Sequence, residues 1–274
     1  MGLIGGSLAK AVKENLNARV YAYDHNILSL ETTKSEGVID GELNSSVLPL
    51  CDLVVLCLYP NDIIRYVDEH KNLFAPNCCI IDFGGIKRKI ISECKAILSD
   101  TTVNFIGCHP MAGREVSGYQ HSLESLFRGR SMIMVPDDAP AELVEQLQIF
   151  FKVIGVGKII ITTAENHDKV IAFTSQLAHV LSNAYVKSPR ALQHKGYTGG
   201  SFQDLSRVAK LNAKMWTELF MVNRDFLIEE IEILITHLSE YSNALREENE
   251  NELYRLLKEG SDIKERLNDE DCQN

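Results

Sequence analysis

The stretch MGLIGGSLAKAV (residues 1–12) joins a cluster of glycines to the start of a helix. In the pattern G-x-G-x-x-G, Gly2 takes the second glycine position, which lets the backbone approach a pyrophosphate. Gly5 takes the third, which lets the helix pack closely on a sheet. The helix itself offers free N–H groups and a partial positive charge to phosphate oxygens. The residues of the predicted dinucleotide-binding turn are Gly2, Leu3, Ile4, Gly5, Gly6 and Ser7.

Beyond this turn, short apolar runs alternate with helical patterns up to about residue 163. The runs predicted as strands are RVYAYD (19–24), DLVVLCLY (52–59), CCIIDFG (78–84), VNFIGCHP (103–110), SMIMVP (131–136) and GKIIITT (157–163). Nearly continuous apolar runs are typical of a parallel sheet that is covered on both faces. The alternation predicts a doubly wound, Rossmann-like α/β domain over residues 1–163.

The strand that should precede the glycine turn is missing from this pattern. A sheet without that strand would leave backbone groups of its neighbours unpaired. We therefore expect either that the native protein has residues upstream of Met1, or that this chain binds its cofactor weakly.

Residues 164–274 contain helical patterns without the short apolar runs of the first part, and predict an all-α domain. The stretch 167–186 places Val170, Phe173 and Leu177 on one helical stripe. Residues 215–245 predict a single long helix with an apolar side, which we expect to pack against a second copy of the chain. From Arg246 onward the sequence is rich in Glu, Asn and Asp, and predicts a solvated helix that ends in a disordered tail.

Composition and charge exclude several classes of protein. The 274 residues carry a formal net charge of −10, which disfavours nucleic acid and anionic membranes as partners. The seven cysteines show no CxxC or Cys/His zinc spacing, so no metal site is predicted, and their place in apolar runs is typical of a reducing cytoplasm. No signal peptide or long apolar run predicts export or a membrane span.

Two polar residues at strand ends are candidates for the site. Asp24 ends the run 19–24 and is placed to bind an adenosine ribose, which favours NAD over NADP; it could also cap the next helix. His109 is the last residue but one of the run 103–110, at the sheet edge where ligands bind in such folds. A histidine there is suited to proton transfer near neutral pH.

Four motifs together identify a family resemblance. GLIGGSLA, GCHPMAGREVSG, HDKVIAFTSQLAH and GGSFQDLSRVAKLNAKMW occur in this order, and the chain resembles the prephenate dehydrogenase family, which includes arogenate dehydrogenases. The resemblance implies an NAD-dependent oxidoreductase acting on a CH–CH donor, which converts prephenate to 4-hydroxyphenylpyruvate with loss of CO2 in tyrosine biosynthesis. It also implies a homodimer formed through the C-terminal helices.

The resemblance further implies roles for individual residues. His109 would be the catalytic histidine at the C4 hydroxyl of the substrate, and Arg207 would bind the side-chain carboxylate. The remaining substrate-site residues would be His179 and Trp216 in the pocket, and Glu115 and Asp204 at its mouth. His167 matches a recurrent position at a helix start, for which we expect a structural role.

One position departs from the family pattern. Gly85 stands where many relatives carry a serine near the nicotinamide and the C4 hydroxyl, whereas Lys87 is retained. Without the serine hydroxyl, the nicotinamide and the C4 hydroxyl should be positioned less well, although a water could take its place.

Alternatives remain open at this stage. An arogenate dehydrogenase differs only in an amino group on the substrate, and no residue distinguishes it. A catalytically impaired NAD-binding relative is suggested by the missing strand and by Gly85. A β-hydroxyacid dehydrogenase would need a GxGxxxK helix, which residues 164–220 lack.

Overall fold

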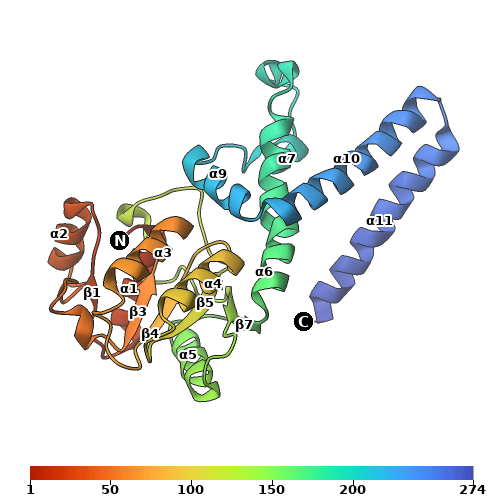
Figure 1. Ribbon diagram of the computed structural model, residues 1–274. Helices are drawn as coiled ribbons and strands as arrows, with labels where there is room; N and C mark the ends of the chain where they lie inside the picture. The colour runs from red at the N-terminus through yellow and green to blue at the C-terminus, as the bar shows by residue number, and fades with distance from the viewer. Residues whose placement is uncertain (274) are drawn as a thin grey trace. The chain divides into compact units, whose positions relative to one another are not determined.

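The computed structural model describes residues 1–273, with side chains up to residue 269 (Figure 1). The chain divides into two compact units, residues 1–224 and residues 225–274. The change at residue 163 from alternating strand and helix patterns to helical patterns alone therefore falls inside the first unit.

Five strands form the main sheet, in the order β3-β4-β5-β6-β7. They are β3 (Leu53–Leu56), β4 (Cys79–Asp82), β5 (Asn104–Pro110), β6 (Ser131–Val135) and β7 (Lys158–Ile161). β3, β4 and β5 run parallel, β6 runs antiparallel to β5, and β7 is parallel to β6. Each strand lies within a predicted apolar run, but the reversal of β6 was not predicted.

The reversal follows from the connection between β5 and β6. A parallel neighbour needs a crossover that carries the chain back along the sheet, and a helix usually provides it. The described residues between Pro110 and Ser131 contain only the short 3₁₀ turn η2 (Tyr119–His121). The chain therefore returns directly as an antiparallel strand.

A second, two-stranded parallel sheet pairs β1 (Tyr21–Ala22) with β2 (Gly41–Glu42). The predicted strand 19–24 is thus much shorter than its sequence pattern. No strand among the described residues joins β1 to β3.

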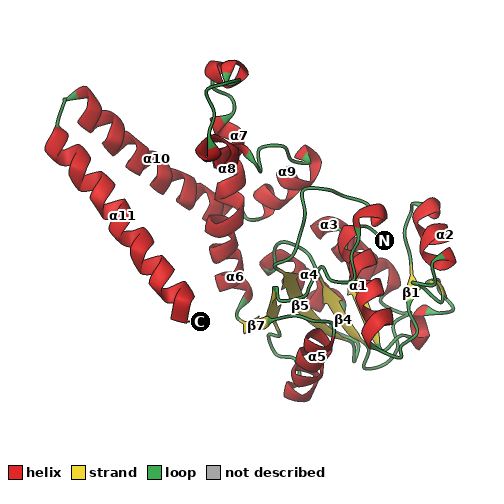
Figure 2. Cartoon of the chain, turned by 180° about the vertical axis from the view of Figure 1, so that it is seen from behind, coloured by secondary structure: helices red, strands yellow, loops and turns green. Residues whose placement is uncertain are grey.

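Helices cover both faces of the main sheet (Figure 2). They are α1 (Leu3–Asn15) and α5 (Ala141–Val153) on one face, and α3 (Pro60–His70), α4 (Arg88–Ile97) and the 3₁₀ turn η1 (Leu48–Leu50) on the other; α2 (Ile27–Ser35) instead packs Leu30 on Ala22 of β1. Ile81 and Ile106 join a core with α1 and α5, whereas Ile80 and Phe105 join a second core with α3 and α4. Successive strand residues point to opposite faces, so the two cores confirm the doubly wound architecture.

The rest of the first unit is helical. Its elements are α6 (Ala164–Ile171), a π-helical turn η3 (Ala172–Leu177), α7 (Ala178–Tyr185), η4 (Pro189–Gln193), α8 (Gly200–Ser206) and α9 (Ala213–Val222). The second unit, from Asp225 on, holds α10 (Arg224–Arg246) and α11 (Glu250–Gln273). The Tyr241 hydroxyl connects these two helices by donating to the Leu256 carbonyl at 3.2 Å. Within the described residues, no helix is long and apolar enough to cross a bilayer.

Two helix predictions need correction. The single helix expected over residues 215–245 is interrupted at Asn223, which separates α9 from α10. The Asn223 side chain is fully buried and donates to the Asp168 carbonyl and to Gln176 Oε1, so a tertiary contact overrides the local helical pattern. The helix from Arg246 onward also extends further than expected, because α11 continues to Gln273; residue 274 lies outside the described residues.

Candidate active site

The glycine turn forms the start of α1. Gly2 is the N-cap and provides no side-chain hydrogen bond, so the first N–H groups of the helix, on Leu3, Ile4 and Gly5, have no intrahelical partner. No atom lies within 4 Å of where a Cβ on Gly2 would stand. Open space in front of free amides is what the pyrophosphate of a dinucleotide requires.

The glycine that permits close packing is Gly6, not Gly5 as predicted. A Cβ on Gly6 would lie 2.7 Å from the ring of Tyr119, which no real contact allows. A Cβ on Gly5 would lie 3.6 Å from Cys57, an ordinary contact. The sequence could not reveal this, because the close neighbour comes from η2 and not from a strand.

Ser7 is also placed differently from the prediction. Its hydroxyl is fully buried, donates to the Leu3 carbonyl at 2.6 Å, and accepts from the Leu123 amide at 2.9 Å. The Ser7 side chain therefore ties α1 to the loop after η2, and both of its hydrogen bonds are made within the protein.

Asp24 lies just beyond β1 and is half-buried. Its carboxylate accepts a hydrogen bond from the Asn26 amide at 2.8 Å and contacts the amino group of Met1. Burial alone would raise the pKa of Asp24, but the ammonium group and the amide outweigh it and lower the pKa. The cap of α2 is Asn26, whose side chain accepts from the Ser29 amide, so Asp24 is not needed for that role.

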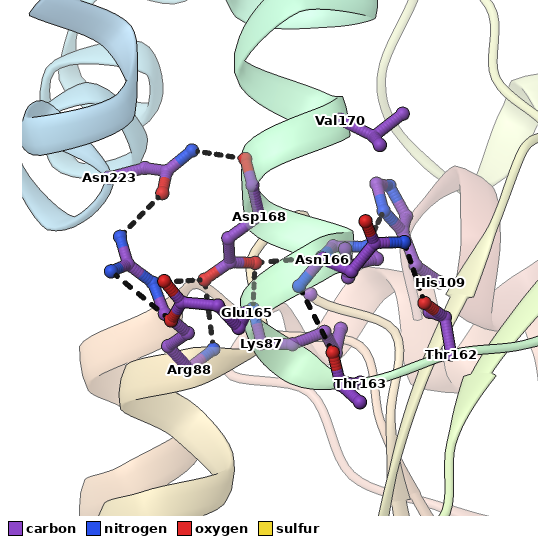
Figure 3. Close-up of polar contacts among 12 residues, drawn as sticks. Lys87, Arg88, His109, Thr162, Thr163, Glu165, Asn166, Asp168, Val170 and Asn223 are labelled. Carbon is purple, nitrogen blue, oxygen red and sulfur yellow. Dashed lines mark hydrogen bonds and ion pairs between the residues drawn. The ribbon is translucent and has the colours of Figure 1, made fainter. Parts of the chain in front are cut away.

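His109 stands at the end of β5, half-buried, and is the outer member of a polar network. Its Nδ1 lies 2.9 Å from Nε2 of His167, and Nδ1 of His167 lies 2.7 Å from Oδ1 of Asp168. His167 and Asp168 are adjacent residues of α6, and both are buried. Figure 3 shows the same helix presenting Asp168 toward α4 and lying beside His109.

The pKa of His109 lies well below its usual range. Burial is the main cause because it disfavours the imidazolium, and repulsion from His167 and Lys87 adds to it. The pKa of His167 is also lowered by burial, although Asp168 opposes the shift. Both rings are therefore neutral near pH 7, and His109 is poised to accept a proton.

A buried ion pair lies beneath this network. Lys87 Nζ contacts Asp82 Oδ2, and both side chains are fully buried. Gly107 of β5 makes room for it, since a Cβ there would lie 2.8 Å from Cδ of Lys87. Burial raises the pKa of the Asp82 carboxyl, against the attraction of Lys87.

The predicted pocket residues form two further contacts. His179 stacks on Trp216 with ring centroids 3.8 Å apart, and both side chains are half-buried. Arg207 forms an ion pair with Glu115, and both are largely exposed. Asp204 is exposed and makes no ion pair with any described residue, so it does not neutralise Arg207 in this structure.

Gly85 lies near α9. A Cβ on Gly85 would lie 3.4 Å from Cδ2 of Leu219, at the edge of ordinary contact, so the position has room for a small side chain.

The sequence pattern placed His167 at a helix start but did not reveal its partners. The residues it did not single out are Asp168, Arg88, Gln176 and Asn223. The adjacent His-Asp pair in the motif HDKV was the available signal, but nothing local shows that the pair faces His109 from another element. Within the described residues, no group of three or more potential ligands could hold a metal ion.

The Rossmann-like sheet, the glycine turn and the histidine at a strand end define a nucleotide-dependent dehydrogenase. Family models for the nucleotide-binding domain and the dimerization domain of prephenate dehydrogenase match residues 8–161 and 163–259. The chain therefore belongs to the prephenate dehydrogenase family.

Individual relatives are distant but similar over nearly the whole chain. Prephenate dehydrogenase of Bacillus subtilis is 24% identical over 97% of this chain and 74% of its own length. Cyclohexadienyl dehydrogenase of Zymomonas mobilis is 27% identical over 94% of this chain and 91% of its own.

Solved structures agree with the family. Prephenate dehydrogenase from A. aeolicus, in complex with hydroxyphenyl propionate and NAD+, has a TM-score of 0.84 and 26% identity, and the match covers 97% of this chain and 95% of that one. Synechocystis arogenate dehydrogenase, at 23% identity, shares the fold with a TM-score of 0.82 over 97% of each chain.

Proposed function

We propose that this chain oxidises prephenate with NAD and releases CO2, giving 4-hydroxyphenylpyruvate for tyrosine biosynthesis. The observation that carries the proposal is the hydrogen-bonded row of His109, His167 and Asp168 at the end of β5, in a member of this family. Arogenate is the alternative substrate, because one relative is named for it and another for cyclohexadienyl compounds in general.

The first turn of α1 fits the cofactor. The unpartnered amides of Leu3, Ile4 and Gly5 and the open space at Gly2 suit the pyrophosphate, and Asp24 suits an adenosine ribose without a 2′-phosphate. When bound, NAD would accept the hydride from C4 of the substrate.

His109 would manage the proton. Nε2 of its neutral ring would accept the proton of the C4 hydroxyl as that oxygen becomes a carbonyl. Loss of the ring carboxylate as CO2 then sends its electron pair into the ring, which becomes a phenolate. The imidazolium returns the proton to this oxygen, so no net proton is released. The protein contributes mainly by orienting the reacting groups.

Arg207 would hold the substrate. The substrate is a dianion and the chain is acidic overall, so binding needs a local cation. A guanidinium can bind a carboxylate through two parallel hydrogen bonds, although Arg207 now contacts Glu115. The stacked pair of His179 and Trp216 would form a wall of the pocket.

We further propose a homodimer that acts in the cytoplasm. The dimerization-domain match and the exposed apolar side chains of Val170, Phe173 and Met221 support self-association. The free thiols in the sheet agree with a reducing compartment.

The test is NADH formation with the purified chain. We expect NADH from prephenate with NAD, far less with NADP, and a strongly reduced rate with His109→Asn. A much higher kcat/KM for arogenate than for prephenate would show that arogenate is the substrate. Absence of turnover with either substrate, at NAD concentrations where calorimetry shows binding, would overturn the proposal.

A further inference from the structure

Asp168 connects two elements that are distant in sequence. Its Oδ1 accepts from the Lys87 amide at 2.7 Å, and its Oδ2 accepts from the Arg88 amide at 2.9 Å. These are the first N–H groups of α4, whose own N-cap residue, Lys87, provides no side-chain cap. Asp168 thus caps α4 from α6, and the guanidinium of Arg88 braces the same carboxylate through Nε at 3.4 Å.

The same carboxylate fixes the protons on two histidines. A carboxylate only accepts hydrogen bonds, so Nδ1 of His167 must carry the hydrogen that it shares with Asp168. Because His167 is neutral, its Nε2 then has a lone pair and accepts. Its partner, Nδ1 of His109, must therefore be the donor. A neutral His109 with hydrogen on Nδ1 has a bare Nε2.

We infer that Asp168 and His167 are positioning residues that hold His109 in the tautomer whose Nε2 can accept a proton. This inference rests on the proposed function for its catalytic consequence, but the tautomer itself does not depend on the substrate. The same row also lets Nδ1 of His109 keep its hydrogen bond after Nε2 has taken up a proton, which orients the imidazolium.

The surroundings hold the row rigidly. Nη2 of Arg88 donates to Oδ1 of Asn223 at 3.0 Å, and Nδ2 of Asn223 donates to the Asp168 carbonyl at 2.8 Å (Figure 3). The charged groups facing the two rings are Asp168 and the buried pair of Lys87 and Asp82. The N-terminus of α4, the Arg88 guanidinium and the His167 ring thus meet on one carboxylate, which leaves it little freedom to turn away from His167.

The direct test measures the tautomer in the unaltered chain. Nitrogen-15 spectra of the histidine rings, assigned with His109→Asn and His167→Gln, distinguish a protonated from a bare ring nitrogen at neutral pH. We expect hydrogen on Nδ1 and a lone pair on Nε2 of His109. The opposite tautomer would overturn the inference even if NADH formation supports the proposed function.

Variants test the chain of contacts. In Asp168→Asn the amide NH2 can take the place of Oδ1 and donate toward Nδ1 of His167, while its oxygen still accepts from the Arg88 amide, so both histidines should switch tautomer. We expect kcat to fall at least ~100-fold, as when a triad aspartate is replaced by asparagine, with KM changed less than about threefold. His167→Phe should show a similar loss. His167→Gln, whose amide can both accept from His109 and donate, should keep kcat within about tenfold of the parent.

His70→Gln is the matched control, because Nδ1 of the His70 ring donates a hydrogen bond to the Tyr66 carbonyl within α3. Circular dichroism and NAD calorimetry establish that each variant folds. If Asp168→Asn folds and keeps both the His109 tautomer and the kcat of the parent, the inference is wrong. If Asp168→Asn does not fold, the spectra of the unaltered chain and the contrast between His167→Phe and His167→Gln decide it: equal kcat values in those two variants would contradict it.

Discussion

Two charged clusters in the candidate site differ in their exposure to water. In the first, the side chains of His167 and Asp168 are at most 2% exposed, and they hold His109 by hydrogen bonds of 2.7–2.9 Å. In the second, Arg207 and Glu115 form an ion pair with side chains 64% and 57% exposed. The first has its geometry without a ligand, whereas the second is solvated, and the proposed substrate would have to displace that water.

The difference suggests a division of labour. Buried hydrogen-bonded groups keep one geometry and shifted pKa values, which suits proton transfer. An exposed ion pair contributes little to stability, so its arginine can change partner at small cost. We therefore expect changes in the buried cluster to affect kcat and stability, and changes in the exposed cluster to affect KM.

The largest expected effect is on turnover at His109. Replacement by asparagine should lower kcat by about 10²–10⁴, because the proton acceptor is lost, while KM for prephenate stays nearly constant. Steady-state kinetics at saturating NAD measures both. A loss expressed mainly in KM would show that His109 binds the substrate and does not take its proton.

Stability gives a second contrast between buried and exposed ion pairs. Lys87→Met leaves Asp82 buried without its partner and should lower the free energy of unfolding by about 3–5 kcal/mol. Glu115→Gln removes an exposed partner of Arg207 and should cost less than about 1 kcal/mol. Urea denaturation of the two variants compares them, and equal losses would refute the contrast.

Arg207→Ala should act on binding. Loss of a hydrogen bond to a charged group costs about 1.5–3 kcal/mol, so KM for prephenate should rise roughly 10- to 150-fold with a smaller change in kcat. Lys at this position should restore only part of the affinity, because an ammonium lacks the planar fork. If Arg207→Ala and His109→Asn change kcat and KM in the same way, the two clusters do not have separate roles in substrate binding and proton transfer.

The pH dependence should follow the lowered pKa values of the two histidines. His109 must be neutral to accept a proton, so the acid limb of kcat/KM should lie below the ordinary histidine value of about 6.5. Unfolding frees both rings to bind protons, so stability should be complete above about pH 6.5 and decline as the pH falls. An acid limb of kcat/KM that lies above pH 7 would show that another group controls the rate.

The smallest expected effect concerns Gly85. A serine Cβ there would be accommodated at 3.4 Å from Leu219, so Gly85→Ser should fold normally. If a hydroxyl helps to position the reacting groups, kcat should rise a few-fold, and Gly85→Ala provides the control for bulk alone. An equal response of the two variants would show that the hydroxyl has no role.

The local pattern of apolar residues was sufficient to predict much of the fold. The runs around residues 52–59, 78–84 and 103–110 each contain a strand, because continuous apolar sequence can only be buried between helices. The sequence also singled out His109, since strand ends of such sheets are where ligands bind.

Other features depend on residues that are far apart along the chain, and only the tertiary structure decided them. Residues 215–245 have an unbroken helical pattern, yet Asn223 ends α9 because Asp168 and Gln176 bind its side chain. Gly6 is required because of Tyr119, which comes from a distant turn. Most importantly, His167 was predicted to be structural, and only the packing of α6 beside the end of β5 places it on His109. The sequence by itself determined which elements form, because periodicity and burial are local properties; which side chains meet depends on packing, which no local pattern encodes.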